Sequence, residues 1–536
     1  MPIAAREENP RLLLTLGYAP PSVTSVGATA TRIGGVTARG PASLAVDEND
    51  RVYIWDRARL RVAVYANGRF ERAIPMPWVE QNADALLVAA GRLYLRATTQ
   101  VGIIEYEIDG ATGALLRAVS SDSGSIYPRR RMTPQRSATH DTFGADAANL
   151  DYRYTFVDQG ANSRYERVDL ARGVLAYALE PAPQKLIDAY PRADGALYEL
   201  ASDYGGVGSV YVYALLAPSA ATRPTSPPPG TAAAPVAFGR PVPDRLTATL
   251  AGAGSVDLDA RSRMAAWALA SLAKERTDLA AAPQNPLFVA QWNDGSRLEI
   301  VVSAGLLFAQ GKTYFGPAAA YEQLASYALA SPPRLAELAA RGATIRITDL
   351  TGLQRALTTG EIAELRASLS KGFNVSEGEL PFVLEDPFPL YEIMLGDVVI
   401  RFRGDDYGSV GERRTGAFVH DGTLDDLARR WLPVPALAVD DPHSLFLADT
   451  VTFEQPGRVA LQDITRWKAS LVRALTAEPG PTGSPELVEE PPATLVFRFA
   501  SGRVETVVVR PGEYTYRGKV IPLPGVMYLV YYRGVP

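Results

Sequence analysis

Hydrophobic and polar residues alternate in short runs near the start of the chain. Four runs follow one another, and each ends in a polar turn, at residues 40–47, 51–56, 61–68 and 69–74. Asn67-Gly68 stands at a tight reversal, and period-two alternation around Asn-Gly is typical of a β-hairpin. The pattern predicts four short antiparallel strands.

This strand pattern recurs through the N-terminal third. Arg51-Val-Tyr53 reappears as Arg92-Leu-Tyr94, and two looser copies follow around residues 152–179 and 195–213. A period near 40 residues with four strands in each copy is typical of a propeller blade. Residues 1–216 are therefore predicted to form a small β-propeller of four or five blades.

The best-defined copy, residues 40–74, resembles an NHL-type propeller repeat. The resemblance rests on Gly40-Pro41, Leu44-Ala-Val-Asp47, Val52-Tyr-Ile-Trp-Asp56 and Asn67-Gly68. It implies a domain that binds proteins, RNA or glycans, or a hydrolase or lyase with a metal ion in its central channel.

Residues 217–243 contain eight prolines among Ala, Ser and Thr, with Arg223 and Arg240 as the only charges. Such a segment buries too little apolar surface to order itself, and it is predicted to be a linker. We expect the propeller to move relative to a semi-rigid C-terminal block. Docking of the propeller on the first C-terminal unit is the alternative.

The C-terminal half contains an internal repeat. The segment from Gly295 to Lys312 recurs without a gap from Gly502 to Lys519. Around it, three copies of one plan are predicted: a short extended segment, a helix, a hairpin and a second hairpin. The extended segments are residues 246–250, 344–348 and 445–448, and the first hairpins are 288–302, 390–402 and 494–509.

The helices are predicted from apolar residues three and four positions apart. They are Met264, Trp267 and Leu272; Ile362, Leu365 and Leu369; and Ile464, Trp467, Leu471 and Leu475. Thr358 and Glu361 have the spacing of a capping box. In the middle copy, residues 404–414 are expected to replace the second hairpin. Two copies close with a short helix, at 321–329 and 423–432, and the third ends in a strand-like segment, 526–533.

The predicted fold class is thus multidomain β and α+β. A propeller at 1–216 and a linker at 217–243 precede three tandem repeats with a helix on an antiparallel sheet, at 244–333, 342–437 and 444–536. The repeats resemble the small YhfM-like domains of exported Gram-positive bacterial proteins. That family has no established catalytic residues, so the resemblance assigns none here.

Composition narrows the functional classes. The net charge is −5, and the 54 basic residues are spread along the 536 rather than clustered. Binding to nucleic acid is therefore not expected. The chain has no Cys, which excludes disulfides and thiolate chemistry, and only three His. No apolar run reaches the length of a transmembrane helix, and the first ten residues lack the pattern of a signal peptide.

The candidate site residues have structural alternatives. Asp47, Asp50 and Asp56 could bind a metal ion, although turn formation is the favoured reading. His140 lies in an insertion beside Arg129-Arg130-Arg131, where a solvated loop is favoured over an anion site. Asp440-Asp441-Pro442-His443 could bind a metal ion, but a connection between the second and third repeats is favoured. At His420 a turn is favoured. Paired-carboxylate catalysis stays open.

The densest polar cluster in the C-terminal half is a predicted binding loop, formed by Asp405, Asp406, Tyr407, Arg413 and Arg414. A solvated loop is its alternative. No catalytic residue and no cofactor are assigned, and a metal ion is left undecided. The sequence predicts a non-catalytic extracytoplasmic or cell-surface protein that binds a protein or glycan. Its alternatives are a cytoplasmic location and a propeller-type hydrolase or lyase with a channel metal.

Overall fold

The computed structural model describes most of the chain between Pro10 and Leu523. Outside the description lie residues 1–9, 18–23, 25, 27–28, 33–35, 81–82, 100–101, 121–125, 127–129, 132–134, 137–139, 144, 147–151, 158–163, 170–173, 180–183, 193–195, 204–208, 217–234, 251–252, 277–286, 304, 351–352, 376–387, 403–406, 412–415, 455–461, 466–467, 477–491 and 524–536. The chain divides into two compact units. The first comprises residues 1–331, 373–381 and 411–419, and the second comprises 332–372, 382–410 and 420–536.

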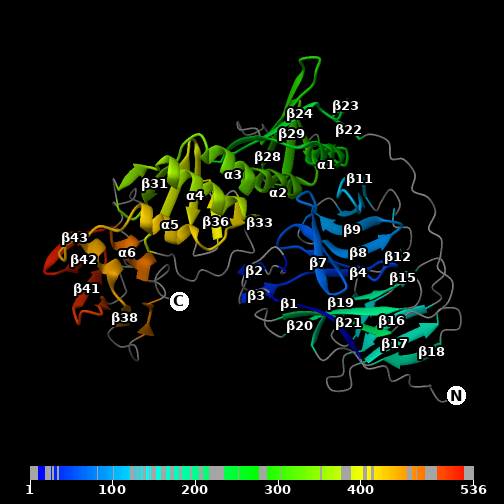
Figure 1. Ribbon diagram of the computed structural model, residues 1–536, viewed down its shortest axis with the longest axis horizontal. Helices are drawn as coiled ribbons and strands as arrows, with labels where there is room; N and C mark the ends of the chain where they lie inside the picture. Colours follow the sequence, from blue (N-terminus) through cyan, green and yellow to red (C-terminus); the bar gives the residue numbers. More distant parts are fainter. Residues whose placement is uncertain are drawn as a thin grey trace. The chain divides into compact units, whose positions relative to one another are not determined.

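The first unit begins with four antiparallel sheets of propeller-like β structure (Figure 1). The first sheet has strands β4 (Ser43–Val46), β5 (Val52–Asp56), β6 (Arg61–Ala66) and β7 (Arg69–Pro75). The second has β8 (Ala83–Ala89), β9 (Arg92–Thr99), β10 (Gly102–Asp109) and β11 (Leu115–Ser120). Both follow sequence order, as the alternating pattern predicted.

The third sheet has five strands, β13 (Gln135–Arg136), β14 (His140–Phe143), β16 (Tyr152–Val157), β17 (Arg164–Asp169) and β18 (Val174–Leu179). The fourth has β19 (Lys185–Pro191), β20 (Leu197–Ser202), β21 (Ser209–Leu216) and β1 (Arg11–Gly17). Because β1 pairs with β21, the start of the chain completes the last of the four sheets. Two small pairs accompany them: β2 (Thr29–Arg32) with β3 (Val36–Arg39), and β12 (Arg130–Arg131) with β15 (Ala145–Asp146).

Two-residue turns connect the strands of several hairpins. Asn67 and Gly68 have φ of 51° and 74°, and Arg517 and Gly518 have 50° and 76°. Positive φ at both central residues is the type I′ turn, whose twist matches that of the flanking strands. The predicted reversals at Asn67-Gly68, Gly311-Lys312 and Gly518-Lys519 each join paired strands.

The end of the predicted linker is ordered. Strands β22 (Val236–Ala237) and β23 (Arg240–Pro241) form a hairpin. The Phe238 ring packs edge-on against Trp267 and Tyr314, at centroid distances of 5.9 and 5.0 Å. Trp267 Nε1 donates to the Arg240 carbonyl at 3.0 Å. The last residues of this segment therefore belong to the α+β structure that follows, and residues 217–234 lie outside the description.

Three larger sheets follow, and their strand orders correspond. The first is β25-β24-β27-β28-β29-β30-β26. In the second, β32-β31-β34-β35-β36 run side by side and β37 pairs with β33. The third is β39-β38-β40-β41-β42-β43. In each, the hairpin predicted from the internal repeat supplies two adjacent strands near the middle.

The strands of the first of these sheets are β24 (Arg245–Leu250), β25 (Gly254–Asp257), β26 (Lys274–Arg276), β27 (Phe288–Gln291), β28 (Arg297–Ser303), β29 (Leu306–Ala309) and β30 (Lys312–Phe315). Those of the second are β31 (Thr344–Ile347), β32 (Gln354–Ala356), β33 (Phe373–Val375), β34 (Tyr391–Leu395), β35 (Val398–Phe402), β36 (Tyr407–Val410) and β37 (Gly416–Val419). Those of the third are β38 (Thr450–Glu454), β39 (Gln462–Asp463), β40 (Ala493–Arg498), β41 (Val504–Arg510), β42 (Glu513–Tyr516) and β43 (Lys519–Pro522).

The helices are α1 (Ala260–Ala270), α2 (Ala318–Leu329), α3 (Pro332–Ala339), α4 (Thr359–Ser370), α5 (Leu424–Trp431), α6 (Lys468–Thr476) and the 3₁₀ helix η4 (Pro442–Leu447). Trp267, Leu365, Leu369 and Leu471 are fully buried, as their spacing predicted, whereas Met264 is 36% exposed. No helix among the described residues is long and apolar enough to cross a membrane.

Three local predictions are wrong. Residues 445–447 are not extended: they belong to η4, Ala448 is its C-cap, and the strand begins at Thr450. The second hairpin of the middle copy is not replaced, because residues 404–414 contain β36 itself. Most of the stretch left between the first two predicted repeats, which end at 333 and begin at 342, is helix α3. The predicted strand at 526–533 lies outside the described residues.

The grouping of the parts also differs from the prediction. The first α+β sheet belongs to the same compact unit as the four N-terminal sheets. In that unit, the Gln323 side chain in α2 donates to the carbonyls of Pro77 and Val79 at 2.7 and 2.6 Å. Arg261 in α1 donates to the Thr112 carbonyl at 3.2 Å. These hydrogen bonds join the four N-terminal sheets to the first α+β sheet within this unit.

Candidate functional site

Asp47, the first predicted metal ligand, closes its own turn. Its Oδ1 accepts from the backbone N–H groups of Asn49 and Arg51 at 2.8 and 2.9 Å. Its Oδ2 accepts from the Tyr53 hydroxyl at 3.1 Å. Burial and this aspartate raise the pKa of Tyr53 to about 12. Both oxygens of Asp47 thus have partners within the β4–β5 connection, which is the turn-forming role favoured from the sequence.

Asp50 and Asp56 bind arginines. Asp50 Oδ1 lies 2.6 Å from Arg192 NH1, and the same nitrogen donates to the Asp47 carbonyl at 2.8 Å. Arg192 is 6% exposed and follows β19, so it ties the fourth sheet to the β4–β5 turn. Asp56 is fully buried and accepts from Arg61 Nε at 3.0 Å. Within the described ranges, no three His, Asp or Glu side chains are grouped so that they could hold a metal ion.

A buried polar contact joins three of the N-terminal sheets. Ser43 Oγ and the Leu44 N–H, in β4, both donate to Asp188 Oδ2 in β19 at 2.8 Å. Ser43 Oγ also accepts from the Leu86 N–H in β8 at 2.9 Å. Ser43 and Asp188 are at most 1% exposed. These groups hold first strands of neighbouring sheets together, which is a structural role.

The three histidines occupy separate places. His140 opens β14 and pairs with Val157, so the predicted loop around it is part of a sheet, and Arg130–Arg131 form β12. His420 is 4% exposed, and its Nδ1 accepts from the Gly422 N–H at 3.2 Å, which confirms the predicted turn. His443 Nδ1 lies 2.7 Å from Asp441 Oδ1, and that oxygen also caps η4.

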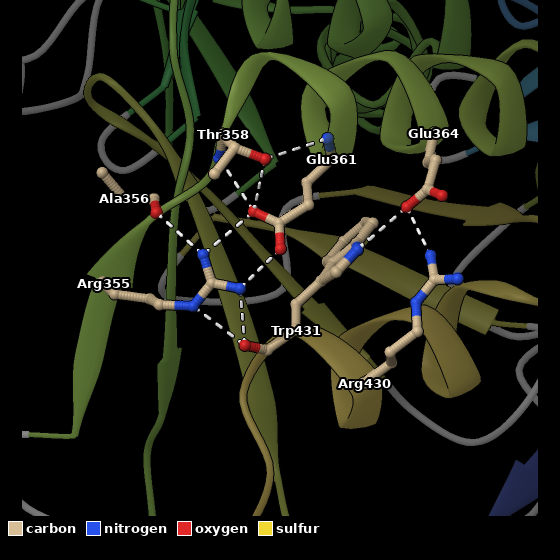
Figure 2. A network of polar contacts seen from close by, with 7 residues as sticks. All are labelled: Arg355, Ala356, Thr358, Glu361, Glu364, Arg430 and Trp431. Carbon is tan, nitrogen blue, oxygen red and sulfur yellow. Dashed lines mark hydrogen bonds and ion pairs between the residues drawn. The ribbon is translucent and has the colours of Figure 1, made fainter.

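A network of polar contacts surrounds Arg355 (Figure 2). Its guanidinium donates through NH1 and NH2 to the two oxygens of Glu361, at 2.9 and 2.6 Å. Through Nε and NH2 it also donates to the Trp431 carbonyl, at 2.8 and 2.6 Å. Arg355 thereby joins strand β32, the start of α4 and the end of α5.

Glu361 is the third helical residue of the predicted capping box, which the structure confirms. Its Oε2 accepts from the Thr358 N–H at 2.8 Å. The Arg355 guanidinium, followed by the Thr358 groups, lowers the pKa of Glu361 to about 2. One turn along, Glu364 accepts from Trp431 Nε1 at 3.0 Å and pairs with Arg430. The contacts drawn in Figure 2 link β32, the start of α4 and the end of α5, so the network fastens these elements together.

The predicted binding loop is divided by a strand. Asp405 and Asp406 precede β36 and Arg413 and Arg414 follow it, and these four residues lie outside the description. Tyr407 begins β36 and is 9% exposed. The acidic and basic pairs are therefore separated along the chain by β36, a strand of about 13 Å at 3.3 Å per residue.

Two tyrosine hydroxyls of strand β21 already have hydrogen-bond acceptors nearby. Tyr213 donates to Gln184 at 2.7 Å, and Tyr211 donates to Asp203 at 3.2 Å. Their rings lie 6.2 Å apart. Tyr528 and Tyr532 lie outside the described residues.

Sequence reasoning missed Asp188, Arg192 and Arg355. Each acts on a partner more than five residues away, and for the first two the separation is over 140 residues. The only local signal was a charged residue inside or beside an apolar run, as in Leu186-Ile-Asp188-Ala-Tyr190. That signal does not show which distant residue the charged group contacts.

No family model matches the chain, and no curated protein matches it. Solved structures resemble parts of it at low similarity. The WD40 β-propeller domain of Doa1 is 10% identical, with a TM-score of 0.13, and the match covers 33% of this chain and 52% of that domain. The glutaminyl cyclase of Myxococcus xanthus is 10% identical, with a TM-score of 0.17 and coverage of 38% and 95%. The computationally designed Ika8 protein is 11% identical, with a TM-score of 0.17 and coverage of 57% and 98%.

Proposed function

We propose that the chain is a non-catalytic binding or scaffolding protein. In this proposal the four N-terminal sheets are the blades of a small propeller, and the three larger sheets are tandem α+β repeats. Together they present surfaces to a protein or glycan partner outside the cytoplasm. The observation that carries the proposal is the open face of each of the three repeated sheets.

One face of each repeated sheet is buried, and the other is exposed in part: Glu299 and Thr506 lie on the more exposed side, whereas Glu392 and Val496 are buried. The strands show this as alternation: β28, β35 and β41 each place every second side chain, with few exceptions, in the core. An antiparallel sheet with one covered face is the ordinary solution for an α+β layer. Each of the three sheets, taken by itself, offers such a face to a partner.

The open faces differ although the strand orders correspond. Equivalent cross-strand positions hold Thr247, Val289 and Glu299 in the first sheet, Arg346, Glu392 and Arg401 in the second, and Thr452, Val496 and Thr506 in the third. Conserving a fold while varying its open face suits recognition. The predicted loop residues Asp405, Asp406, Arg413 and Arg414 flank β36 of the second sheet and are included in the proposed surface.

The proposed location rests on the linker. Proline- and threonine-rich connections such as residues 217–234 are frequent between the folded units of exported surface proteins.

Capture of partners by the immobilised full-length chain tests the binding role. We expect a saturable protein or glycan partner from the surface fraction of source cells, and its retention should survive chelation. Metal analysis of the same preparation tests the enzyme alternative. A stoichiometric metal ion whose removal abolishes a hydrolase or lyase activity would replace the proposal, and so would a partner found only in the cytoplasm.

A further inference from the structure

Two arginines and a glutamate meet at one end of the third α+β sheet, and we call them the Arg503 cluster. Arg503 precedes β41, Glu505 lies in β41, and Arg517 opens the turn between β42 and β43. The strands from β40 to β43 are antiparallel neighbours in sequence order (Figure 1). The β40–β41 and β42–β43 turns therefore lie at the same end of the sheet. Arg503 and Glu505 are two residues apart, so their side chains project from the same face.

Glu505 is held by Arg517. Arg517 Nε donates to Glu505 Oε2 at 2.9 Å, and Arg517 NH2 pairs with the other oxygen, Oε1. The Glu505 side chain is 7% exposed, whereas that of Arg517 is 40% exposed. Among the described residues, no second carboxylate is paired with Arg503 or Arg517. Both oxygens of Glu505 are thus used by one arginine.

Arg503 is left with long polar contacts. Its Nε lies 3.5 Å from Glu505 Oε1, and its NH2 lies 3.5 Å from Ser444 Oγ. Within the described part of the chain, the buried Nε has no hydrogen-bond partner. The guanidinium stacks on the Phe499 ring, 3.6 Å from its centroid, and the side chain stays 24% exposed. The cluster therefore carries one net positive charge, and Arg503 is its less tightly paired member.

The fold forms without these charges. The internal repeat aligns residues 295–312 with residues 502–519. It places Ser296, Leu298 and Gln310 of the first sheet at the three positions of the Arg503 cluster, in that order. The first sheet nevertheless has the corresponding strands β28, β29 and β30 side by side. Recognition therefore explains the charged residues of the third sheet better than packing does.

Exposed apolar side chains flank the Arg503 cluster. Val439 is 44% exposed, and its carbonyl accepts from the hydroxyls of Ser444 and Tyr516 at 3.3 and 2.8 Å. Leu447 is 50% exposed and lies three residues after Ser444 in η4, where residues three apart share a face. Both are thus next to the serine that contacts Arg503. Arginine and aromatic groups beside apolar side chains are typical of protein-binding surfaces.

We propose that the Arg503 cluster binds a carboxylate of an acidic polypeptide whose neighbouring side chains are apolar. Guanidinium N–H groups match a carboxylate, and the Phe499 ring already holds the Arg503 guanidinium in place, so binding orders few further groups. One net positive charge balances one carboxylate better than a phosphate group, which carries nearly two charges. Val439 and Leu447 give apolar contacts that phosphate or a uronic acid would not use. This inference rests on the binding role proposed above and names the chemistry of its partner.

The test measures binding of a labelled, capped hexapeptide of alternating leucine and glutamate to the full-length protein, by fluorescence anisotropy at low salt. One comparison peptide has glutamine in place of glutamate, and another has glycine in place of leucine. Inorganic phosphate and glucuronate are the competitors. We expect the leucine–glutamate peptide to bind about ten-fold more tightly than either comparison peptide, and neither competitor to displace it at equal concentration.

Three variants that copy the first repeat test the members of the cluster. R503S should weaken binding of the leucine–glutamate peptide about ten-fold, the loss expected for one charge-assisted hydrogen bond. R517Q leaves Glu505 to Arg503 and removes the net charge, so it should weaken binding as well. E505L raises the net charge, so it should strengthen binding several-fold. A cluster that only supported the fold would lose binding in all three variants.

R510Q is the matched control. Arg510 is about half exposed at the other end of β41, 4.0 Å from Glu513, so R510Q removes one positive charge from the same strand. It should change the affinity less than two-fold.

Failure of the leucine–glutamate peptide to bind overturns the inference, as does an equal loss in R510Q or weaker binding by E505L. Equal binding of either comparison peptide, or displacement by phosphate or glucuronate, overturns it too. Capture of a cellular partner that R503S leaves unchanged would overturn the inference while sustaining the proposed function. Absence of any captured partner would count against the proposed function itself.

Discussion

Arg473 in α6 forms a two-pronged ion pair with Asp349, which follows β31. Nε lies 2.5 Å from Oδ1 and NH2 lies 3.0 Å from Oδ2, although 124 residues separate the two in the chain. The Asp349 side chain is only 2% exposed. Beside it, the rings of Phe388 and Phe446 stack at 4.2 Å. Within the second unit, the third sheet is thus fastened to the second by a buried ion pair and an aromatic contact.

R473Q should destabilise the second unit by about 2–3 kcal/mol, because it leaves a buried carboxylate without its cation. Asp349 keeps one hydrogen bond, from the Leu390 N–H at 2.9 Å, which limits the loss. Calorimetric unfolding of the full chain measures the effect.

R297Q serves as the surface control, because Arg297 pairs with Glu299 and both side chains are about half exposed. Such surface ion pairs contribute less than about 1 kcal/mol. Equal destabilisation by R473Q and R297Q would show that the ion pair between Arg473 and Asp349 adds nothing beyond a surface contact.

The sequence predicted local features well where one signal dominates. Asn67-Gly68 specified its turn, and Thr358 with Glu361 specified a capping box, because each depends on residues within three positions. Helix η4 was missed although Asp441 followed by Pro442 is a helix-start signal, since the apolar Leu445-Phe-Leu447 also suits a strand.

Long-range partners could not be read from the chain. Glu392 lies between Tyr391 and Ile393 in an apolar strand, and nothing local shows that Arg346 and Arg401 stand on either side of it. Register supplies that information, and register depends on the whole sheet. The candidate loop illustrates the same limit, because β36 could not be recognised within a polar segment.

Two glycines give opposite predictions for substitution by alanine. A Cβ on Gly416 in β37 would lie 2.6 Å from both Ala330 Cβ and Ser326 O, at the end of α2. G416A should therefore cost about 1–3 kcal/mol through overpacking. Gly360 in α4 has nothing within 4 Å of such a Cβ, so G360A should stabilise by about 0.5–1 kcal/mol. Denaturant titration measures both, and a neutral G416A would mean that α2 and β37 are less closely packed.

Glu80 should make the first unit less stable as pH rises. Burial raises the pKa of this carboxyl to about 7, from an ordinary 4.5. Between these values the folded state binds more protons than the unfolded state, so stability falls from about pH 4.5 to pH 7 and stays lower above. E80Q should match the wild type near pH 4.5 and exceed it by roughly 1–2 kcal/mol at pH 8, discounted for partial exposure. Parallel stability profiles for the two proteins would contradict this.

Glu361 should make the second unit less stable as pH falls, which is opposite to the effect of Glu80. Its lowered pKa, about 2, means that its contribution is complete above about pH 4.5 and is lost as pH falls toward 2. E361Q should destabilise α4 by up to about 1 kcal/mol at pH 6, because Gln can still accept the cap hydrogen bond but loses the ion pair with Arg355, and by almost nothing at pH 2. Amide exchange of α4 in the two proteins measures the difference. An equal deficit at both pH values would assign the effect to packing instead.

Cleavage of the linker tests whether the four N-terminal sheets and the first α+β sheet form one unit. A specific protease site placed between Pro227 and Gly230 cuts the chain before the β22–β23 hairpin. The fragments should still elute together, because Gln323 bonds to the Pro77 and Val79 carbonyls and Arg59 stacks on the Phe373 ring at 4.8 Å. Q323A combined with R59A and R261A should let them separate, since the contact of Arg261 with the Thr112 carbonyl is then lost as well, on cleaved chains that have no covalent tether. Separation of the unmutated fragments at micromolar concentration would restore the independent propeller that the sequence first suggested.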